Sequence, residues 1–291
     1  MTLHQVWFLF KTALNAWVDD YAQSMGAALA YYTMFSIAPL LLIVISVAGL
    51  IFGQEAARAE IASQLQTLMG EQGASAVQAL LAGVNKPVEG FTATAIGVSL
   101  LLIGATTVFA ELQDSLDRIW HAPKRPEAGG LSGVWTLLNS RLLSFGMILG
   151  IGFVLMVSLV FSAGLSLIGK WWSPMFAGWQ IVASIADLVL SFVLTTGMFA
   201  LIYKVMPRVR VHWSDVWFGA VITATLFAVG KFLIGAYIGR SAITSAFGAA
   251  GSLVALLVWV YYSAQIFLLG AEITVAYSSI FGSRRDLPPL S

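Results

Sequence analysis

The sequence predicts an all-α, polytopic membrane protein with six transmembrane helices. Two observations lead to this prediction: 59% of the 291 residues are hydrophobic and only 10% are charged, and six stretches are long and apolar enough to cross a bilayer. A transmembrane helix needs roughly 20 consecutive, mostly apolar residues, and within lipid its backbone polar groups must bond to one another. The six predicted spans are Ala27–Phe52, Phe91–Ala110, Leu142–Gly169, Ile181–Tyr203, Val216–Ile238 and Phe247–Tyr277.

The spans and their short connections account for nearly all of the sequence. We therefore expect a single membrane domain over 1–291 and no soluble catalytic domain. The net charge of +1 gives no reason to expect nucleic-acid binding. The absence of cysteine excludes disulfides and thiolate metal sites, and no cofactor or metal is expected. Residues 1–20 lack the long apolar core of a cleavable signal peptide.

The segment 1–20 has the pattern of an amphipathic helix. Trp7, Phe10, Leu14 and Trp17 recur at helical spacing, with polar residues elsewhere around the helix. Such a helix lies on the membrane surface with its apolar face in the lipid. The alternative is a helix that simply extends the first span.

The first connection, 53–90, is the only long one, and we predict two short helices in it that cap the outer mouth of the protein. A lid is the alternative to a structural cap. The two helices are separated by Gly70 and Gly73. Their apolar faces carry Ile61, Leu65 and Leu68 in the first helix and Val77, Leu80, Leu81 and Val84 in the second.

The first span contains Pro39, which removes a backbone hydrogen bond and usually kinks a helix. Kinked helices occur at transport sites, although proline is also ordinary in membrane helices. We include Pro39 with Tyr31 and Tyr32 of the same span among the candidate residues of a substrate pathway. No internal repeat is evident, which weakens the case for an inverted-repeat transporter.

Basic residues gather on one face of the predicted topology. The N-terminus, the second and fourth connections and the tail over 278–291 contain ten Lys and Arg residues, whereas the first, third and fifth connections contain four. Because basic residues near span ends are retained in the cytoplasm, we predict that both termini are cytoplasmic. The long first connection then lies outside.

Two charged residues lie inside predicted spans, where they are costly and usually face the protein interior or water. Asp187 of the fourth span and Lys231 of the fifth lie at similar depth in the outer half of the membrane. We predict an ion pair between them. It is either a structural pair that fixes helix register or a charge switch for a coupling ion or an anionic headgroup.

A second polar group is expected at the inner ends of the second and sixth spans. Glu111 and Asp114 share one helical face, and Tyr261, Gln265 and Glu272 share another. These residues indicate a polar vestibule that opens to the cytoplasm. The alternative is an interfacial salt-bridge network that ties the two spans to Lys204, Arg208 and Arg210 of the fourth connection.

Three segments, Ala27–Pro39, Thr107–Trp120 and Gly248–Glu272, resemble the YihY/BrkB family of bacterial inner-membrane proteins in order and spacing. The resemblance covers nearly the whole chain, although Asp117 stands where the family pattern leads us to expect Asn. It implies six helices and both termini inside, and no agreed activity. Family members are labelled a serum-resistance virulence factor or the tRNA-processing ribonuclease BN, and the family is linked to envelope lipid or lipopolysaccharide traffic.

The residues argue against a ribonuclease. None of the three histidines, His4, His121 and His212, belongs to a set of His and carboxylate residues at ligand spacing that would form a metal cluster, and no basic, aromatic surface is available for RNA. An intramembrane enzyme is also disfavoured, because there is no Gly-x-Ser-x-Gly elbow and no His/carboxylate dyad in a span.

We therefore expect a transporter or flippase-like protein for a lipidic or amphiphilic envelope substrate, with membrane lipids and a second copy of the chain as the candidate partners. The alternative is a non-transporting scaffold or regulator of envelope assembly. The chain has no P-loop, so transport would need an ion gradient or a partner protein. A solvent-accessible cavity that reaches Glu272 and Asp187 would favour transport, and a tight, dry bundle would favour a scaffold.

Overall fold

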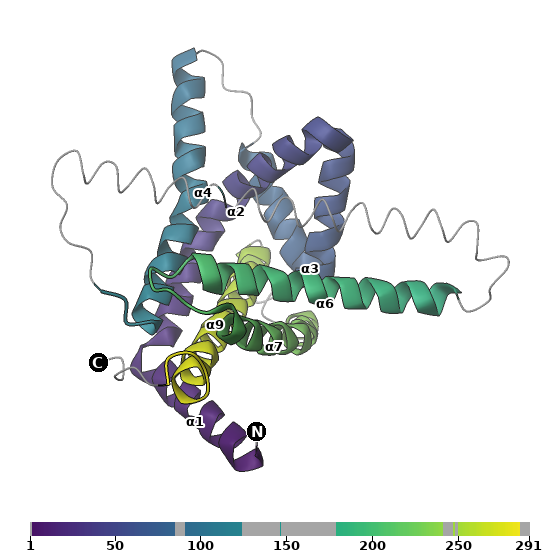
Figure 1. Cartoon of the computed structure of the whole chain (residues 1–291). Coiled ribbons are helices and arrows are strands. Elements are labelled where there is room, and N and C mark those ends of the chain that lie inside the picture. Colours follow the sequence, from purple (N-terminus) through teal and green to yellow (C-terminus); the bar gives the residue numbers. More distant parts are fainter. Residues whose placement is uncertain are drawn as a thin grey trace, which may run out of the picture.

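A computed structural model of the chain describes residues 2–84, 91–123, 179–240 and 250–285, together with the single residues 146 and 247. Within these ranges all regular structure is helical, which confirms the all-α class (Figure 1). The helices are α1 (Leu3–Asp19), α2 (Ala22–Phe52), α3 (Gln54–Val84), α4 (Phe91–Ile119), α6 (Trp179–Val205), α7 (Trp213–Arg240) and α9 (Gly251–Ile280).

Four helices of the described part are long and apolar enough to cross a membrane, and they agree with the first, fourth, fifth and sixth predicted spans. Helix α4 runs without interruption through the second predicted span. The third, Leu142–Gly169, lies outside the described residues except for Gly146. The membrane class is therefore confirmed, and the count of six stays a prediction. The four candidate spans are Ala22–Leu50, Ser184–Val205, Trp213–Ile234 and Gly251–Ile280.

The first helix is separate from the first span. Helix α1 ends at Asp19, and Tyr21 adopts a left-handed conformation with φ of 57° before α2 begins at Ala22. A residue in this conformation cannot continue a helix. The alternative of one helix extended from the first span is therefore wrong.

Helix α1 has two apolar faces rather than one. Leu9 and Ala13 are buried against Ile273 and Ala276 of α9, whereas Trp7, with 70% of its surface exposed, faces away from the protein. Of the predicted stripe, Leu14 is also exposed, while Phe10 and Trp17 pack partly against the core. The exposed apolar face is what a helix on a membrane surface requires.

Helix α3 confirms the two helices predicted in the first connection. Its backbone breaks at Gly70, where φ is 74° and ψ is 178°, so that two arms fold back beside α2 (Figure 1). Ile61 and Leu65 of the first arm and Val77 of the second are buried in the main core. Leu80 and Leu81 pack against the same core, and the side chains of Leu68 and Val84 lie outside the described part.

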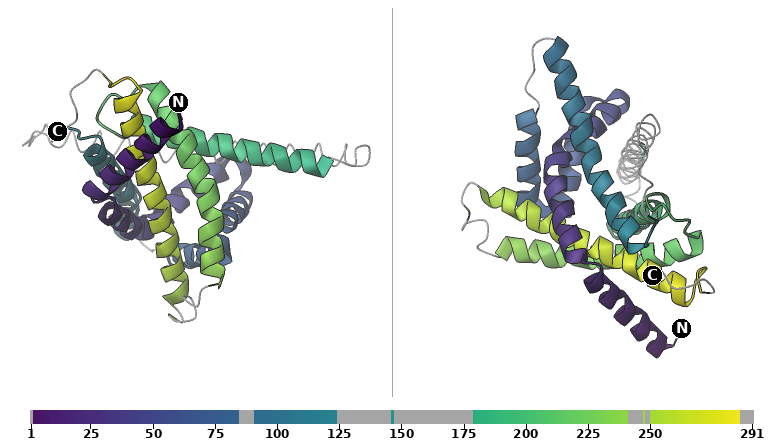
Figure 2. Two further views of the ribbon diagram at one scale, coloured as in Figure 1. Left: turned by 90° about the horizontal axis from the view of Figure 1, so that it is seen from below. Right: turned by 90° about the vertical axis from the view of Figure 1, so that its left-hand side faces the viewer.

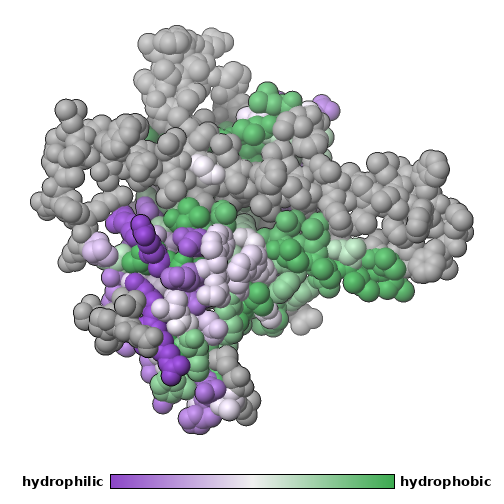
Figure 3. All heavy atoms as spheres, in the orientation of Figure 1, coloured by the Kyte–Doolittle hydropathy of each residue, from purple (hydrophilic) through white to green (hydrophobic). Residues whose placement is uncertain are grey.

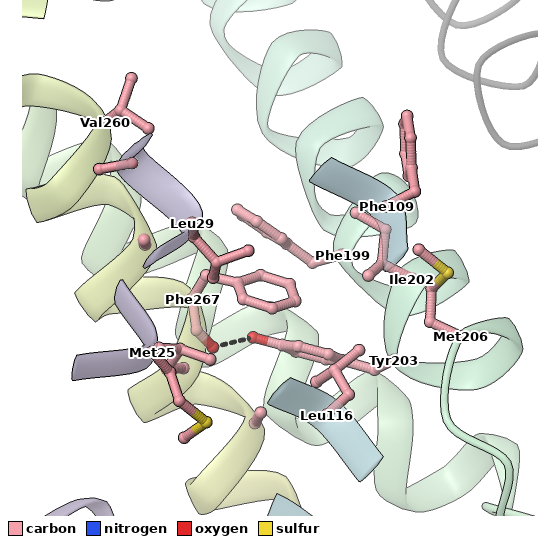
Figure 4. Close-up of a cluster of buried hydrophobic side chains, with 14 of the residues drawn as sticks. Met25, Leu29, Phe109, Leu116, Phe199, Ile202, Tyr203, Met206, Val260 and Phe267 are labelled. Carbon is pink, nitrogen blue, oxygen red and sulfur yellow. Dashed lines mark hydrogen bonds between the residues drawn. The ribbon is translucent and has the colours of Figure 1, made fainter. Parts of the chain in front are cut away.

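The core lies where two helix pairs meet. Helix α2 packs along α4, and α7 packs along α9, and the two pairs cross steeply (Figure 2). Tyr203 of α6 lies at this crossing. Its hydroxyl donates a hydrogen bond of 2.7 Å to the carbonyl oxygen of Phe267 and lies 3.1 Å from Thr223 Oγ1 (Figure 4). These bonds satisfy a polar atom in the middle of an apolar cluster.

Small residues allow α7 and α9 to approach closely. A Cβ atom on Gly270 would lie 1.9 Å from Thr223 Oγ1 and 2.6 Å from the Tyr203 hydroxyl. We expect Gly270→Ala to lower the free energy of unfolding by about 1–3 kcal/mol, the usual cost of overpacking, as measured by thermal unfolding in detergent. The matched control is Gly197→Ala, because nothing lies within 4 Å of its Cβ position. Equal effects of the two substitutions would contradict the packing.

Candidate functional site

Hydrophilic side chains gather at one end of the protein, over the end of α4, the connection between α6 and α7, and the tail that follows α9 (Figure 3). In the same view, the surface over α6 is apolar. The polar end comprises three groups of contacts, which join parts of the chain that are far apart in sequence.

The first group, the Arg208 cluster, consists of Asp114 and Asp117 of α4 with Arg208. Asp117 Oδ2 lies 3.1 Å from Arg208 Nε, and Asp117 Oδ1 accepts a hydrogen bond of 2.8 Å from the Arg208 backbone N–H. Asp114 Oδ1 lies 3.5 Å from Arg208 Nη2. Asp117 is only 8% exposed, so its pair contributes more than the exposed Asp114 pair. Asp117 was not among the candidate residues, although it is the position that departs from the family pattern.

The second group is centred on Asp215, a buried residue in the first turn of α7. Its Oδ2 accepts hydrogen bonds from the Ser283 hydroxyl at 2.6 Å and the Ser283 backbone N–H at 3.2 Å. Its Oδ1 accepts one from the Ser214 hydroxyl at 3.2 Å. An acid in the first turn of a helix is favoured by the helix dipole, and this signal alone could have identified Asp215 in the sequence.

In the third group, the Arg284 guanidinium lies 5.6 Å from the ring centroid of Trp120, which is completely buried at the end of α4. A cation over an aromatic ring at this distance is attracted to its face. Together with the Asp215 contacts, this fixes the start of the tail against α4 and α7.

Glu272 is different from the other acids. It is 2% exposed, and its carboxyl group lies close to that of Asp20, in the turn between α1 and α2. Its Oε1 atom has no hydrogen-bond partner in the described part of the chain, and no described Lys or Arg forms an ion pair with either acid. Two carboxylates at close range repel each other when both are ionised.

Gln265 lies on the same face of α9, two turns before Glu272, and also contacts the start of α2. Its Nε2 atom lies 3.4 Å from the carbonyl oxygens of Ala22 and Gln23. Gly26 makes room for the amide, because a Cβ atom there would lie 2.0 Å from Gln265 Nε2. We call this contact between α9 and the α1–α2 turn, with Asp20, Gln265 and Glu272, the α2–α9 seam. Tyr261, one turn earlier on α9, is exposed.

The acids predicted to form one vestibule are divided by their described contacts. Asp114 belongs to the Arg208 cluster, and Glu272 belongs to the α2–α9 seam. Glu111 lies just after the predicted second span. Partial burial raises the pKa of its carboxyl group, nearby Asp114 raises it further, and Arg118 lowers it. The contact of α4 with Arg208 is part of the salt-bridge network that the sequence offered as an alternative.

The remaining candidates lie on α2, α6 and α7. Helices α6 and α7 are packed neighbours, but the side chain of Asp187 lies outside the described part, so its pair with Lys231 stays a prediction. Tyr31 is exposed and contacts the ring of Tyr32 edge-on at 5.5 Å between centroids. Pro39 lies inside α2, which continues beyond it. The described residues contain no group of three or more His, Asp or Glu that could hold a metal.

The apolar spans and the polar contacts at their ends define a polytopic, α-helical membrane protein. The chain belongs to the family described as virulence factor BrkB, whose family model matches residues 13–289.

Relatives of the chain are described as UPF0761 membrane proteins. One from Psychrobacter sp. (strain PRwf-1) is 25% identical over 97% of this chain and 50% of its own length. One from Aeromonas salmonicida is 28% identical over 84% of this chain and 80% of its own length. A third, from Pseudomonas aeruginosa, is 27% identical over 95% of this chain and 64% of its own length. This chain thus spans half the length of the Psychrobacter relative. No solved structure matches it.

Proposed function

We propose that the protein is a transporter or flippase-like protein for a lipidic or amphiphilic envelope substrate, rather than an enzyme. It acts in the bacterial inner membrane, with both termini cytoplasmic and membrane lipids around it. The observation that carries the proposal is the Asp20–Glu272 pair, in which a buried acid of a candidate span faces another acid and no described base.

Unlike Glu272, the other buried acids of the described chain have a basic partner or hydrogen-bond donors. Asp117 is balanced by Arg208, and Asp215 accepts three hydrogen bonds from serines. A buried carboxyl group without such partners is costly, and an ionisable residue inside a membrane span is a functional candidate by default. For packing alone, an apolar side chain at position 272 would serve α9 better than Glu272 does.

The pair also gives a physical route for coupling. Two ionised carboxylates at this contact repel each other, whereas a proton on either one lets it donate a hydrogen bond to the other. Protonation therefore biases the contact between the first and last described helices, which is what an ion-driven transporter without an ATP site requires.

The proposal is tested with the purified full chain in vesicles that contain a fluorescent, headgroup-labelled phospholipid. We expect the label to become accessible to an external quencher faster than in protein-free vesicles, with a rate that changes when a pH gradient is imposed. Rates equal to those of protein-free vesicles, with and without the gradient, would contradict transport and leave the scaffold role, which the extensive fixed contacts of the tail favour.

A further inference from the structure

Helix α2 and the two arms of α3 line a partly open cavity of about 250 Å³. Leu42 and Ile45 of α2 form one wall, and Ile61 and Leu65 of the first arm form another. Leu81 of the second arm closes the apolar part. The break at Gly70, where φ is 74° and ψ is 178°, reverses the chain, so that the apolar faces of the two arms meet across this space.

Two polar residues, Arg58 and Gln78, line the same cavity, one from each arm of α3. Arg58 is one helical turn before Ile61, and Gln78 is one turn before Leu81, so each polar group lies next to the apolar wall of its own arm. The lining contains one basic residue and no acid. The cavity is therefore apolar at one side and positive at the other.

The guanidinium of Arg58 is not used by the described protein. It forms no ion pair or hydrogen bond with a described residue, although Glu55 and Glu60 lie near it on the same arm. Glu60 instead accepts a hydrogen bond of 2.9 Å from Gln64. The side chain of Arg58 is exposed, and no described residue occupies its five donors, which can bind an anion.

The position along α2 indicates where in a bilayer the cavity lies. Leu42 and Ile45 precede Leu50, the end of the candidate span, by roughly 12 Å and 8 Å at about 1.5 Å per residue. With a hydrocarbon core about 30 Å thick, these side chains lie at the depth of the upper acyl chain. Because α3 begins at Gln54 and folds back beside α2, Arg58 lies one turn closer than Ile61 to the end of the span and therefore on the headgroup side of the apolar wall.

We propose that this cavity binds one anionic phospholipid of the surrounding leaflet, with its phosphate on Arg58 and the upper part of an acyl chain between α2 and the arms of α3. A guanidinium binds phosphate through two parallel hydrogen bonds, and Gln78 can donate to a headgroup oxygen. The positive charge, in a lining that contains no acid, favours a headgroup of net negative charge over a zwitterionic one. That this lipid is also the substrate rests on the proposed function; the binding site itself does not.

The test is native mass spectrometry of the purified full chain titrated with phosphatidylglycerol or with phosphatidylcholine. We expect preferential binding of phosphatidylglycerol, and roughly tenfold weaker binding in Arg58→Gln, as for the loss of a charge-assisted hydrogen bond. The matched control is Arg210→Gln, since Arg210 is an exposed base outside the cavity. A second variant, Leu81→Trp, fills the cavity and is expected to weaken binding without removing the charge.

Two results would overturn the site: phosphatidylglycerol binding that is equal in wild type, Arg58→Gln and Leu81→Trp, or equal displacement by laurate, which would indicate a carboxylate or detergent site. Because Arg58 is exposed, the unfolding temperature of Arg58→Gln is expected to match wild type. If lipid flipping occurs but binding does not depend on Arg58, the site is wrong and the proposed function stands. If binding depends on Arg58 but no flipping occurs, the proposed function is wrong and the site stands.

Discussion

Glu272→Gln is expected to reduce transport to the protein-free background while the unfolding temperature stays the same or rises. Gln has nearly the same volume and can donate a hydrogen bond to Asp20, so the contact between α9 and the α1–α2 turn is kept. It cannot gain or lose a proton, so the contact no longer responds to an ion gradient. The measurement is the vesicle flipping rate, with and without a pH gradient, beside thermal unfolding of the same preparation.

The matched control for Glu272→Gln is Asp215→Asn, which also replaces a buried acid by its amide. Asp215 uses both oxygens as acceptors, so the substitution is expected to lower the free energy of unfolding by about 1–3 kcal/mol and to leave the flipping rate of the folded protein unchanged. If Glu272→Gln retains wild-type stability and full transport, Glu272 has neither role, and the site moves to Asp187 and Lys231.

The second large effect is expected for Asp117→Ala, which should lower the free energy of unfolding by about 3 kcal/mol. The substitution removes a buried carboxylate and leaves the half-buried Arg208 guanidinium without its closest partner, the situation in which breaking a buried pair is most costly. Asp117→Asn is expected to cost less, because the amide oxygen still accepts from the backbone N–H of Arg208. Thermal unfolding in detergent measures both.

A double-mutant cycle separates the ion pair from simple packing. Arg208→Ala alone should destabilise, and the double variant should lose less than the sum of the two single losses. Additive losses would mean that Asp117 and Arg208 stabilise the protein independently, and that the ion pair between them contributes nothing to stability.

The elements of this fold could be predicted from sequence because apolar stretches long enough to cross a bilayer have few other uses. The break of α3 at Gly70 could be predicted because glycine is the residue that tolerates a positive φ. The boundary between α1 and α2 could not, because Tyr21 takes the left-handed conformation without being glycine. The hydrophobic pattern of the sequence also could not distinguish the two apolar faces of α1, because the protein-facing Leu9 and the outward-facing Trp7 are both hydrophobic.

The partners of the polar residues could not be predicted, because helical phase says which way a side chain points and not what it meets. Arg208 and Asp117 are 91 residues apart, and the Gln265 amide contacts Ala22 across 243 residues. The shared phase of Gln265 and Glu272 on α9 was visible in the sequence. That their face meets the α1–α2 turn, where Asp20 lies, depends on how the helices cross, which a single sequence does not contain.

The separation of 243 residues across the α2–α9 seam has a consequence for biosynthesis. Helices α1 and α2 leave the ribosome long before α9, so Leu9, Ala13 and Asp20 have no partners during most of translation. The seam can form only after the last described helix has entered the membrane, and a chain interrupted before α9 keeps its membrane anchors but lacks the acid pair. If the acid pair serves the proposed function, the order of synthesis itself keeps incomplete products inactive, without a separate inhibitor.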